Sequence, residues 1–82
     1  MSTREEANKV FEEAGKVLDE KDSLYGESWK GLRLKQCYDE IARTLERLQV
    51  KLRKGVKTKK ELLDIMNWSA FAYLKEEEGN QK

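Results

Sequence analysis

The chain has 82 residues, of which 40% are charged and 38% hydrophobic, and it contains neither proline nor histidine. The length predicts a single domain, residues 1–82, and the composition favours long solvated helices over a β-rich fold. The absence of histidine excludes histidine general bases, serine–histidine pairs and histidine zinc sites, so any bound metal would be a hard, oxygen-ligated cation such as Mg²⁺ or Mn²⁺.

The net charge is only +1, but it is unevenly distributed: residues 1–28 carry −4, residues 29–60 carry +8 and residues 61–82 carry −3. Segments of opposite sign can pack side by side, and the basic middle could also face phosphates. Cys37 is the only cysteine, which excludes an intrachain disulfide. No apolar run approaches the roughly 18 residues of a membrane span, and the N-terminus does not resemble a signal peptide. We therefore expect a cytoplasmic protein without membrane contact.

The first expected helix spans residues 3–22. Thr3 followed by Glu6 predicts a capping box at its start. Apolar side chains then recur at helical spacing: Ala7, Val10, Phe11, Ala14, Val17 and Leu18. In the stretch that follows, Tyr25 and Trp29 stand between two helices, with Gly26 available for a turn. The two aromatic side chains would either cap the end of a bundle or form a wall on which a nucleobase stacks.

The second expected helix spans residues 31–54. Its apolar residues form one narrow seam: Leu34, Cys37, Ile41, Leu45, Leu48 and Leu52. Gly55 is expected just after the helix end. Asp39 and Glu40 lie beside the seam, and Arg43 follows one turn later. This group is either a surface ladder of ion pairs or one half of a metal site between two helices.

The third expected helix spans residues 58–77, with Thr58 and Glu61 predicting a second capping box. Residues 62–74 are apolar almost all the way round the helix, which is typical of a helix buried on more than one side. We therefore expect an all-α fold in which a three-helix chain forms a bundle completed by homo-oligomerisation, as a homodimer or a higher oligomer. The tail, residues 78–82, is expected to fray.

Glu61, Asp64 and Asn67 lie one helical turn apart on this third helix. An E-x-x-D pair on a helix can chelate Mg²⁺ because residues three apart point the same way. Alternatively, Glu61 serves its capping box and Asp64 pairs with an arginine of the second helix. The basic run over residues 51–60 could meet nucleic-acid phosphates. No aromatic residue interleaves that run, and a solvated turn explains most of it, which disfavours nucleic acid as a partner.

Several pieces of the chain together resemble the small nucleotide modification associated domain proteins, which are found in phages and bacteria and are related to the all-α MazG-like nucleotide pyrophosphohydrolases. The matching pieces span residues 21–74: Lys21, Tyr25-Gly26-Glu27-Ser28-Trp29, Arg43, Arg47 and Asp64-Ile65-Met66-Asn67-Trp68. Glu61-x-x-Asp64 also matches half of the MazG-like metal signature, whereas Arg43 stands where that signature has a carboxylate ligand.

The resemblance implies a helical protein that binds a nucleoside triphosphate with Mg²⁺ or Mn²⁺, as a binding protein or as a pyrophosphohydrolase. In the hydrolytic version, a metal-bound water attacks the link between the α and β phosphates and gives a monophosphate and pyrophosphate. The implied site residues are Glu40, Glu61 and Asp64 for the metal and catalysis, Lys35 and Arg43 for the phosphates, and Tyr25, Trp29 and Asn67 for the base or sugar.

Two other functions are compatible with the sequence. The chain is alternatively a non-enzymatic helical oligomer, for example a viral or archaeal interaction protein, in which Asp64 and Asn67 form a buried polar network at the subunit interface. The third possibility is a nucleic-acid-binding protein that uses residues 51–60.

Overall fold

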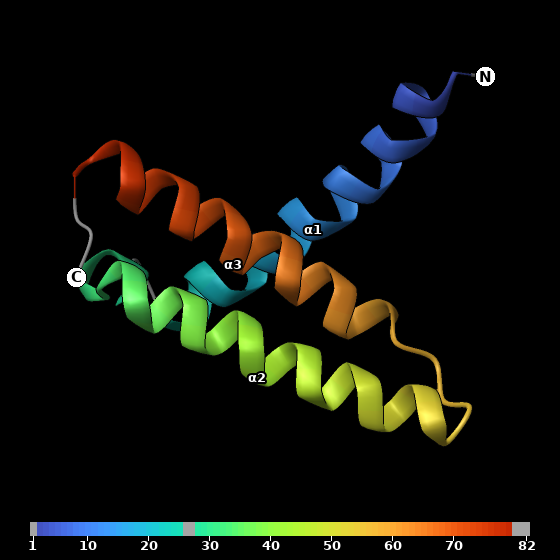
Figure 1. Cartoon of the computed structure of the whole chain (residues 1–82). Coiled ribbons are helices and arrows are strands. Elements are labelled where there is room, and N and C mark those ends of the chain that lie inside the picture. Colours follow the sequence, from blue (N-terminus) through green and yellow to red (C-terminus); the bar gives the residue numbers. More distant parts are fainter. Residues whose placement is uncertain (1, 26–27, 80–82) are drawn as a thin grey trace.

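The computed structural model describes residues 2–25 and 28–79, and within them the chain forms α-helices and no strand (Figure 1). Helix α1 spans Thr3–Tyr25, the short 3₁₀ helix η1 spans Ser28–Gly31, α2 spans Leu34–Arg53 and α3 spans Lys59–Glu77. The predicted all-α class with three helices is thus confirmed for this part of the chain. Three predictions fall outside the described part of the structure. They are the turn at Gly26, the ligand contact of the Tyr25 side chain, and the fraying of residues 80–82.

The cap of the first helix and the first residue of the second helix differ from those expected. Ser2, not Thr3, caps α1, because the backbone N–H of Glu5 donates to Ser2 Oγ at 3.2 Å. Both Ser2-x-x-Glu5 and Thr3-x-x-Glu6 fit the capping-box pattern, so the sequence alone did not separate them. Helix α2 begins at Leu34 rather than at Gly31, because residues 28–31 form the separate helix η1. The backbone N–H of Arg33 donates to the Gln36 side chain at 2.7 Å and so closes the start of α2.

The predicted capping box at the start of α3 is wrong. Thr58 precedes the helix, but its side chain makes no capping hydrogen bond. The Glu61 carboxylate instead accepts a hydrogen bond from Lys51 of α2 at 2.8 Å. Glu61 therefore pairs with Lys51 of α2 instead of capping the start of its own helix.

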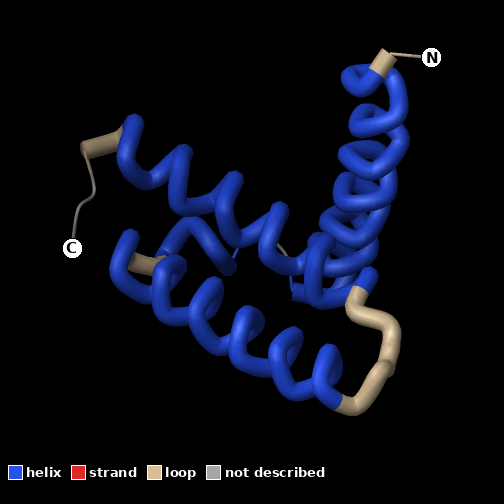
Figure 2. The backbone as a smooth tube through the Cα atoms, turned by 45° about the vertical axis from the view of Figure 1, so that its right-hand side comes forward, coloured by secondary structure: helices blue, strands red, loops and turns tan. Residues whose placement is uncertain are grey.

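Helices α2 and α3 form an antiparallel hairpin, and α1 crosses α3 (Figure 2). The hairpin turns at Gly55, whose φ of +70° is readily adopted by glycine. Since α3 contacts both α1 and α2, it is the central helix of the three. The first half of α1 extends away from the hairpin (Figure 1). None of the described helices is long and apolar enough to cross a membrane.

The core between α2 and α3 is small. It is built from Leu34, Cys37 and Ala72, with Trp68 and Phe71 packed against them. Cys37 is fully buried, and this burial raises the pKa of its thiol. So small a core leaves many large apolar side chains at the surface.

The buried stripe of α2 departs from the predicted seam in its second half. Thr44 is completely buried, whereas Leu45 is 45% exposed and Leu52 is 68% exposed. The Thr44 hydroxyl donates to the Glu40 carbonyl at 2.8 Å and accepts from Arg47 at 3.1 Å, so its burial leaves no unpaired polar group. The leucines thus lie at the edge of the hairpin rather than inside it.

Candidate functional site

Glu61, a predicted metal ligand, is held by the C-terminal half of α2. It is 5% exposed, and one carboxylate oxygen, Oε2, lies 2.8 Å from Lys51 Nζ. The hydrogen bond from Lys51 lowers the pKa of the Glu61 carboxyl below its ordinary value. The other oxygen, Oε1, is buried without a hydrogen-bond partner in the described part of the chain. Lys51 also belongs to the basic segment considered for nucleic-acid binding, and here its ammonium group pairs with Glu61 across the α2–α3 hairpin.

Asp64, the second predicted ligand, pairs with the first helix rather than with an arginine of the second. Lys21 Nζ of α1 lies 3.2 Å from Asp64 Oδ1, and the Asp64 side chain is only 13% exposed. The sequence alternative of an arginine partner is therefore wrong, although the expected ion pair exists. This pair ties the C-terminal half of α1 to α3.

Asn67 adds a second link between the same two helices. Its Nδ2 donates to the carbonyl oxygen of Ala14 at 3.1 Å, and both residues are buried. The amide predicted to contact a base or sugar is thus turned toward α1. Together with the Lys21–Asp64 pair, this bond fixes where α1 crosses α3.

Glu40, the third predicted ligand, lies on α2 beside Arg43, whose Nη1 is 2.5 Å from Glu40 Oε1. The three predicted ligands therefore each pair with a different cationic side chain. Within residues 2–25 and 28–79, no group of three or more cysteine, aspartate or glutamate side chains is placed to hold a metal ion. The Mg²⁺ site stays a prediction, and we derive no chemical step through it.

Three hollows neighbour one another, one between α1, η1 and α3 and two along α2. The aromatic hollow, of about 420 Å³, is lined by Leu18, Lys21, Asp22, Ser28, Trp29, Leu32, Trp68 and Phe71. The central hollow, of about 440 Å³, is lined by Leu32, Gln36, Asp39, Glu40, Arg43 and Trp68. The basic hollow, of about 540 Å³, is lined by Arg43, Glu46, Arg47, Val50, Lys51 and Lys54. Leu32 and Trp68 border both the aromatic and the central hollow, and Arg43 borders both the central and the basic hollow. We call the three neighbouring hollows together the groove, with an aromatic end and a cationic end.

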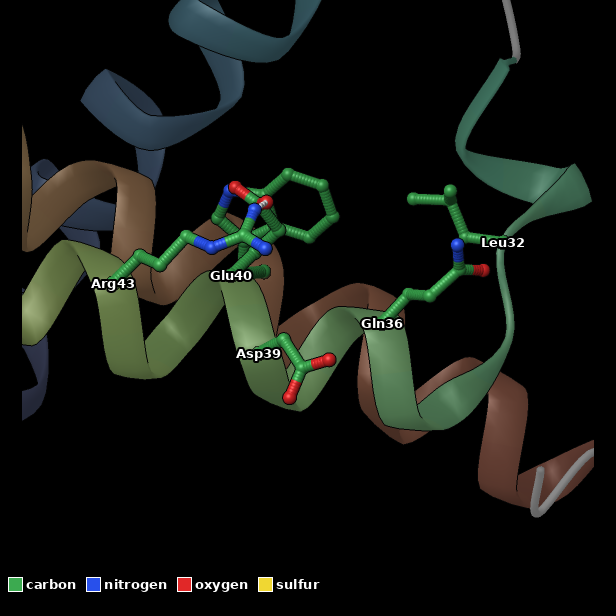
Figure 3. A pocket seen from close by; sticks show the side chains of 6 residues that line it. Leu32, Gln36, Asp39, Glu40 and Arg43 are labelled. Atoms are coloured by element: carbon green, nitrogen blue, oxygen red, sulfur yellow. Dashed lines mark hydrogen bonds and ion pairs between the residues drawn. The ribbon is translucent and has the colours of Figure 1, made fainter.

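The central hollow contains two of the predicted site residues, Glu40 and Arg43. Figure 3 shows the Arg43 guanidinium lying against the Glu40 carboxylate, with Gln36 farther along the same helix. The Arg43 side chain is 66% exposed, so it remains accessible from solvent. Lys35, predicted to meet phosphates, does not line the groove; its side chain is 79% exposed and pairs with Asp39 at 3.4 Å.

Trp29 connects η1 to α3 at the aromatic end of the groove. Its ring stacks on Phe71 with centroids 4.6 Å apart, and Trp68 meets Phe71 edge-on at 5.5 Å. The ammonium group of the buried Lys75 lies 5.7 Å from the centroid of the Trp29 ring and donates to the carbonyl of Lys30. Trp29 thus packs against the hairpin and also lines the aromatic hollow.

Sequence reasoning did not assign site roles to Trp68, Phe71 or Lys75. Trp68 closes the Asp-x-x-Asn-Trp piece of the resemblance, which is the one signal that pointed toward it. Lys75 opens a charged tail sequence, and nothing local distinguishes it from the exposed glutamates that follow.

No protein-family model, no curated protein and no solved structure matches this chain.

Proposed function

We propose that this chain is a small helical nucleotide-binding protein whose ligand lies along the groove beside α2. The observation that carries the proposal is the order of the three hollows, from aromatic through mixed polar to cationic. A nucleotide presents the same order of chemistry, with a planar base, a sugar rich in hydroxyl groups and a chain of phosphates. The ligand is therefore proposed to lie with its base toward Trp29 and its phosphates toward Arg47.

The aromatic hollow suits the base. Trp29, Trp68 and Phe71 contribute ring surface, and Lys21 and Ser28 add polar groups at the rim. Stacking of a base on an aromatic side chain contributes about 1–3 kcal/mol and tolerates any of the bases. The hollow therefore supports affinity for bases as a class.

Arg43 lies between the central and basic hollows and is the natural phosphate contact. A guanidinium group binds phosphate oxygens in a bidentate manner, and Arg47 and Lys54 continue the positive charge along the groove. In the free protein Arg43 is held by Glu40, but an exposed ion pair of this kind contributes only about 0–1 kcal/mol. A phosphate can thus displace Glu40 from Arg43 at little cost.

Binding, rather than hydrolysis, is the activity that the arrangement supports. Hydrolysis to a monophosphate and pyrophosphate in the manner of the resembled family would use a metal-held water. The carboxylates predicted to hold that metal are engaged by Arg43, Lys51 and Lys21. Hydrolysis is therefore examined in the same experiment as a separate outcome.

The test is a fluorescence titration with each ribo- and deoxyribonucleoside triphosphate, with and without Mg²⁺. Both tryptophans of the chain line the aromatic hollow, so quenching reports directly on that end of the groove. Arg43→Gln is expected to weaken binding at least tenfold. Arg53→Gln, an equal loss of charge on the same helix outside the groove, is expected to leave binding unchanged.

Each result bears on the proposal. Quenching by nucleotides that Arg43→Gln weakens and Arg53→Gln does not would support the groove. The absence of binding by every nucleotide, or equal affinity of wild type and Arg43→Gln, would overturn it. Anion-exchange analysis of the incubated nucleotides then separates binding from metal-dependent release of pyrophosphate.

A further inference from the structure

Helix α1 supplies two charged side chains to the aromatic hollow. Trp29, Trp68 and Phe71 line this hollow with aromatic rings, whereas α1 adds Lys21 and Asp22. Among the described residues, Asp22 is the only acid that lines it. Stacking on the rings holds any base, but a carboxylate accepts hydrogen bonds and donates none. Asp22 therefore adds a selectivity that the rings do not provide.

The Asp22 carboxylate is available to a ligand. Asp22 is exposed, and within residues 2–25 and 28–79 no hydrogen bond or ion pair engages it. The preceding residue is anchored, because Lys21 Nζ lies 3.2 Å from Asp64 Oδ1 of α3. This ion pair holds the turn of α1 that carries Asp22 against the helix that supplies Trp68 and Phe71. The carboxylate thus lines the same hollow as the rings, with both of its oxygens unpaired.

The nucleobases differ in the donors that they present along one edge. Guanine presents two adjacent donors, a ring N–H and an exocyclic amino group, beside a carbonyl oxygen. Adenine and cytosine present one amino group beside a ring nitrogen that accepts, and uracil and thymine present one N–H between two carbonyl oxygens. A carboxylate offers two acceptor oxygens, so it pairs with both donors of guanine and meets an acceptor on every other base.

We propose that Asp22 makes the groove selective for guanine nucleotides. This inference rests on the nucleotide-binding function proposed above and identifies the base. Guanine stacks on the rings of the aromatic hollow and donates from its ring N–H and its amino group to the two oxygens of Asp22. The Lys21 ammonium group has three N–H donors, so it can donate to the guanine carbonyl oxygen while it stays paired with Asp64.

The same carboxylate also favours one orientation of the ligand. Asp22 repels phosphate oxygens, and Asp64 neutralises Lys21, so the aromatic end does not attract the anionic part of a nucleotide. At the other end of the groove, four cationic side chains and the single acid Glu46 line the basic hollow. Asp22 therefore disfavours a nucleotide bound with its phosphates beside the rings.

Fluorescence titration of the full chain with GTP and three close analogues tests the assignment. Inosine triphosphate lacks the exocyclic amino group of GTP, xanthosine triphosphate carries a carbonyl oxygen in its place, and ATP has a single donor on the same edge. The wild type is expected to bind GTP about tenfold more tightly than each of the other three, since a bidentate pair discriminates between bases to about this extent.

Asp22→Asn tests the residue itself, because it replaces one acceptor oxygen with a donor. The new amide can donate to the carbonyl oxygen of xanthine, so the ratio of GTP to xanthosine triphosphate affinity is expected to fall about tenfold or more. This ratio is the readout because the lost negative charge strengthens the binding of every triphosphate alike. Asp19→Asn, an equal loss of charge at an exposed position of α1 outside the groove, is expected to keep the wild-type ratio.

The outcomes separate this inference from the nucleotide-binding function. A preference for GTP that Asp22→Asn shifts toward xanthosine triphosphate, and that Asp19→Asn retains, would support it. Equal affinity for all four nucleotides, a preference for another base, or an unchanged ratio in Asp22→Asn would overturn the role of Asp22 and leave nucleotide binding standing. Binding of none of the four would overturn both proposals.

Discussion

Replacement of Asn67 by alanine tests whether the contact between α1 and α3 depends on the Asn67 amide. In the structure, Asn67 Nδ2 donates to the carbonyl oxygen of Ala14 at 3.1 Å, and the Asn67 residue is 6% exposed. A buried hydrogen bond of this neutral kind contributes about 0.5–1.5 kcal/mol to the free energy of unfolding. Ala14 lies inside α1, so its carbonyl keeps its helical partner and the loss should stay near 1 kcal/mol.

The alanine also raises helix propensity, which partly conceals this loss. Asparagine to alanine within a helix gains about 0.6 kcal/mol. Asn8→Ala provides the matched control, because Asn8 is exposed in α1 and makes the same change in propensity. The difference between the two variants should therefore be about 1 kcal/mol, or about 4–8 °C in Tm for a domain of this size.

Urea and thermal unfolding followed by circular dichroism, at one fixed protein concentration, measure that difference. Hydrogen exchange adds a local test, because the amides of α1 should lose protection in Asn67→Ala before those of α2. Equal shifts for Asn67→Ala and Asn8→Ala would refute the structural role of the amide. Asn67 would then be available for the ligand contact that the sequence analysis assigned to it.

Two further predictions concern the turn and the Glu61 ion pair. Gly55→Ala should destabilise the chain by about 1 kcal/mol because the backbone of Gly55 has a positive φ. Gly15→Ala should stabilise it by about 0.5–1 kcal/mol, because Gly15 lies inside α1 with open space around it. Thermal unfolding in which both variants shift Tm in the same direction would contradict this. Since Lys51 lowers the pKa of Glu61 in the folded chain, the resulting stabilisation is present above the ordinary pKa of 4.5 and is lost as the pH falls through the lowered value. The difference in unfolding free energy between wild type and Glu61→Gln should therefore shrink below about pH 4.5. If this difference is the same at pH 3 and pH 7, the ion pair does not stabilise the fold.

The helices could be predicted from the sequence because their signals are local. The apolar spacing and the glycine at position 55 lie within a few residues of the structure they specify. The same spacing did not show which stripe of α2 faces α3. Leu45 and Thr44 are neighbours on adjoining stripes, and the choice between them depends on the partner helix. Both stripes are readable in the sequence, but only the assembled hairpin shows which one is used.

The candidate site was less predictable because its contacts join distant positions. Lys21 and Asp64 are 43 residues apart, and no local pattern links them. The buried Lys75 ammonium group contacts the Trp29 ring and the Lys30 carbonyl, which lie 46 and 45 residues earlier in the chain. Spacing indicated the ion pair between Glu40 and Arg43, because this contact lies within a single helix. The phosphate role of Arg43 came from the family resemblance and not from spacing.

The central place of α3 has a consequence for synthesis of the chain. A ribosome releases α1 and α2 before α3, the helix on which both of them pack. Helix α2 gains its partner quickly, because the turn at Gly55 joins it directly to α3 and contacts between neighbouring elements form fast. Helix α1 cannot dock until α3 has emerged, so the face that includes Ala14 is without its native contacts until then. The interval in which α1 lacks its partner is therefore set by how long after α1 the helix α3 is synthesised.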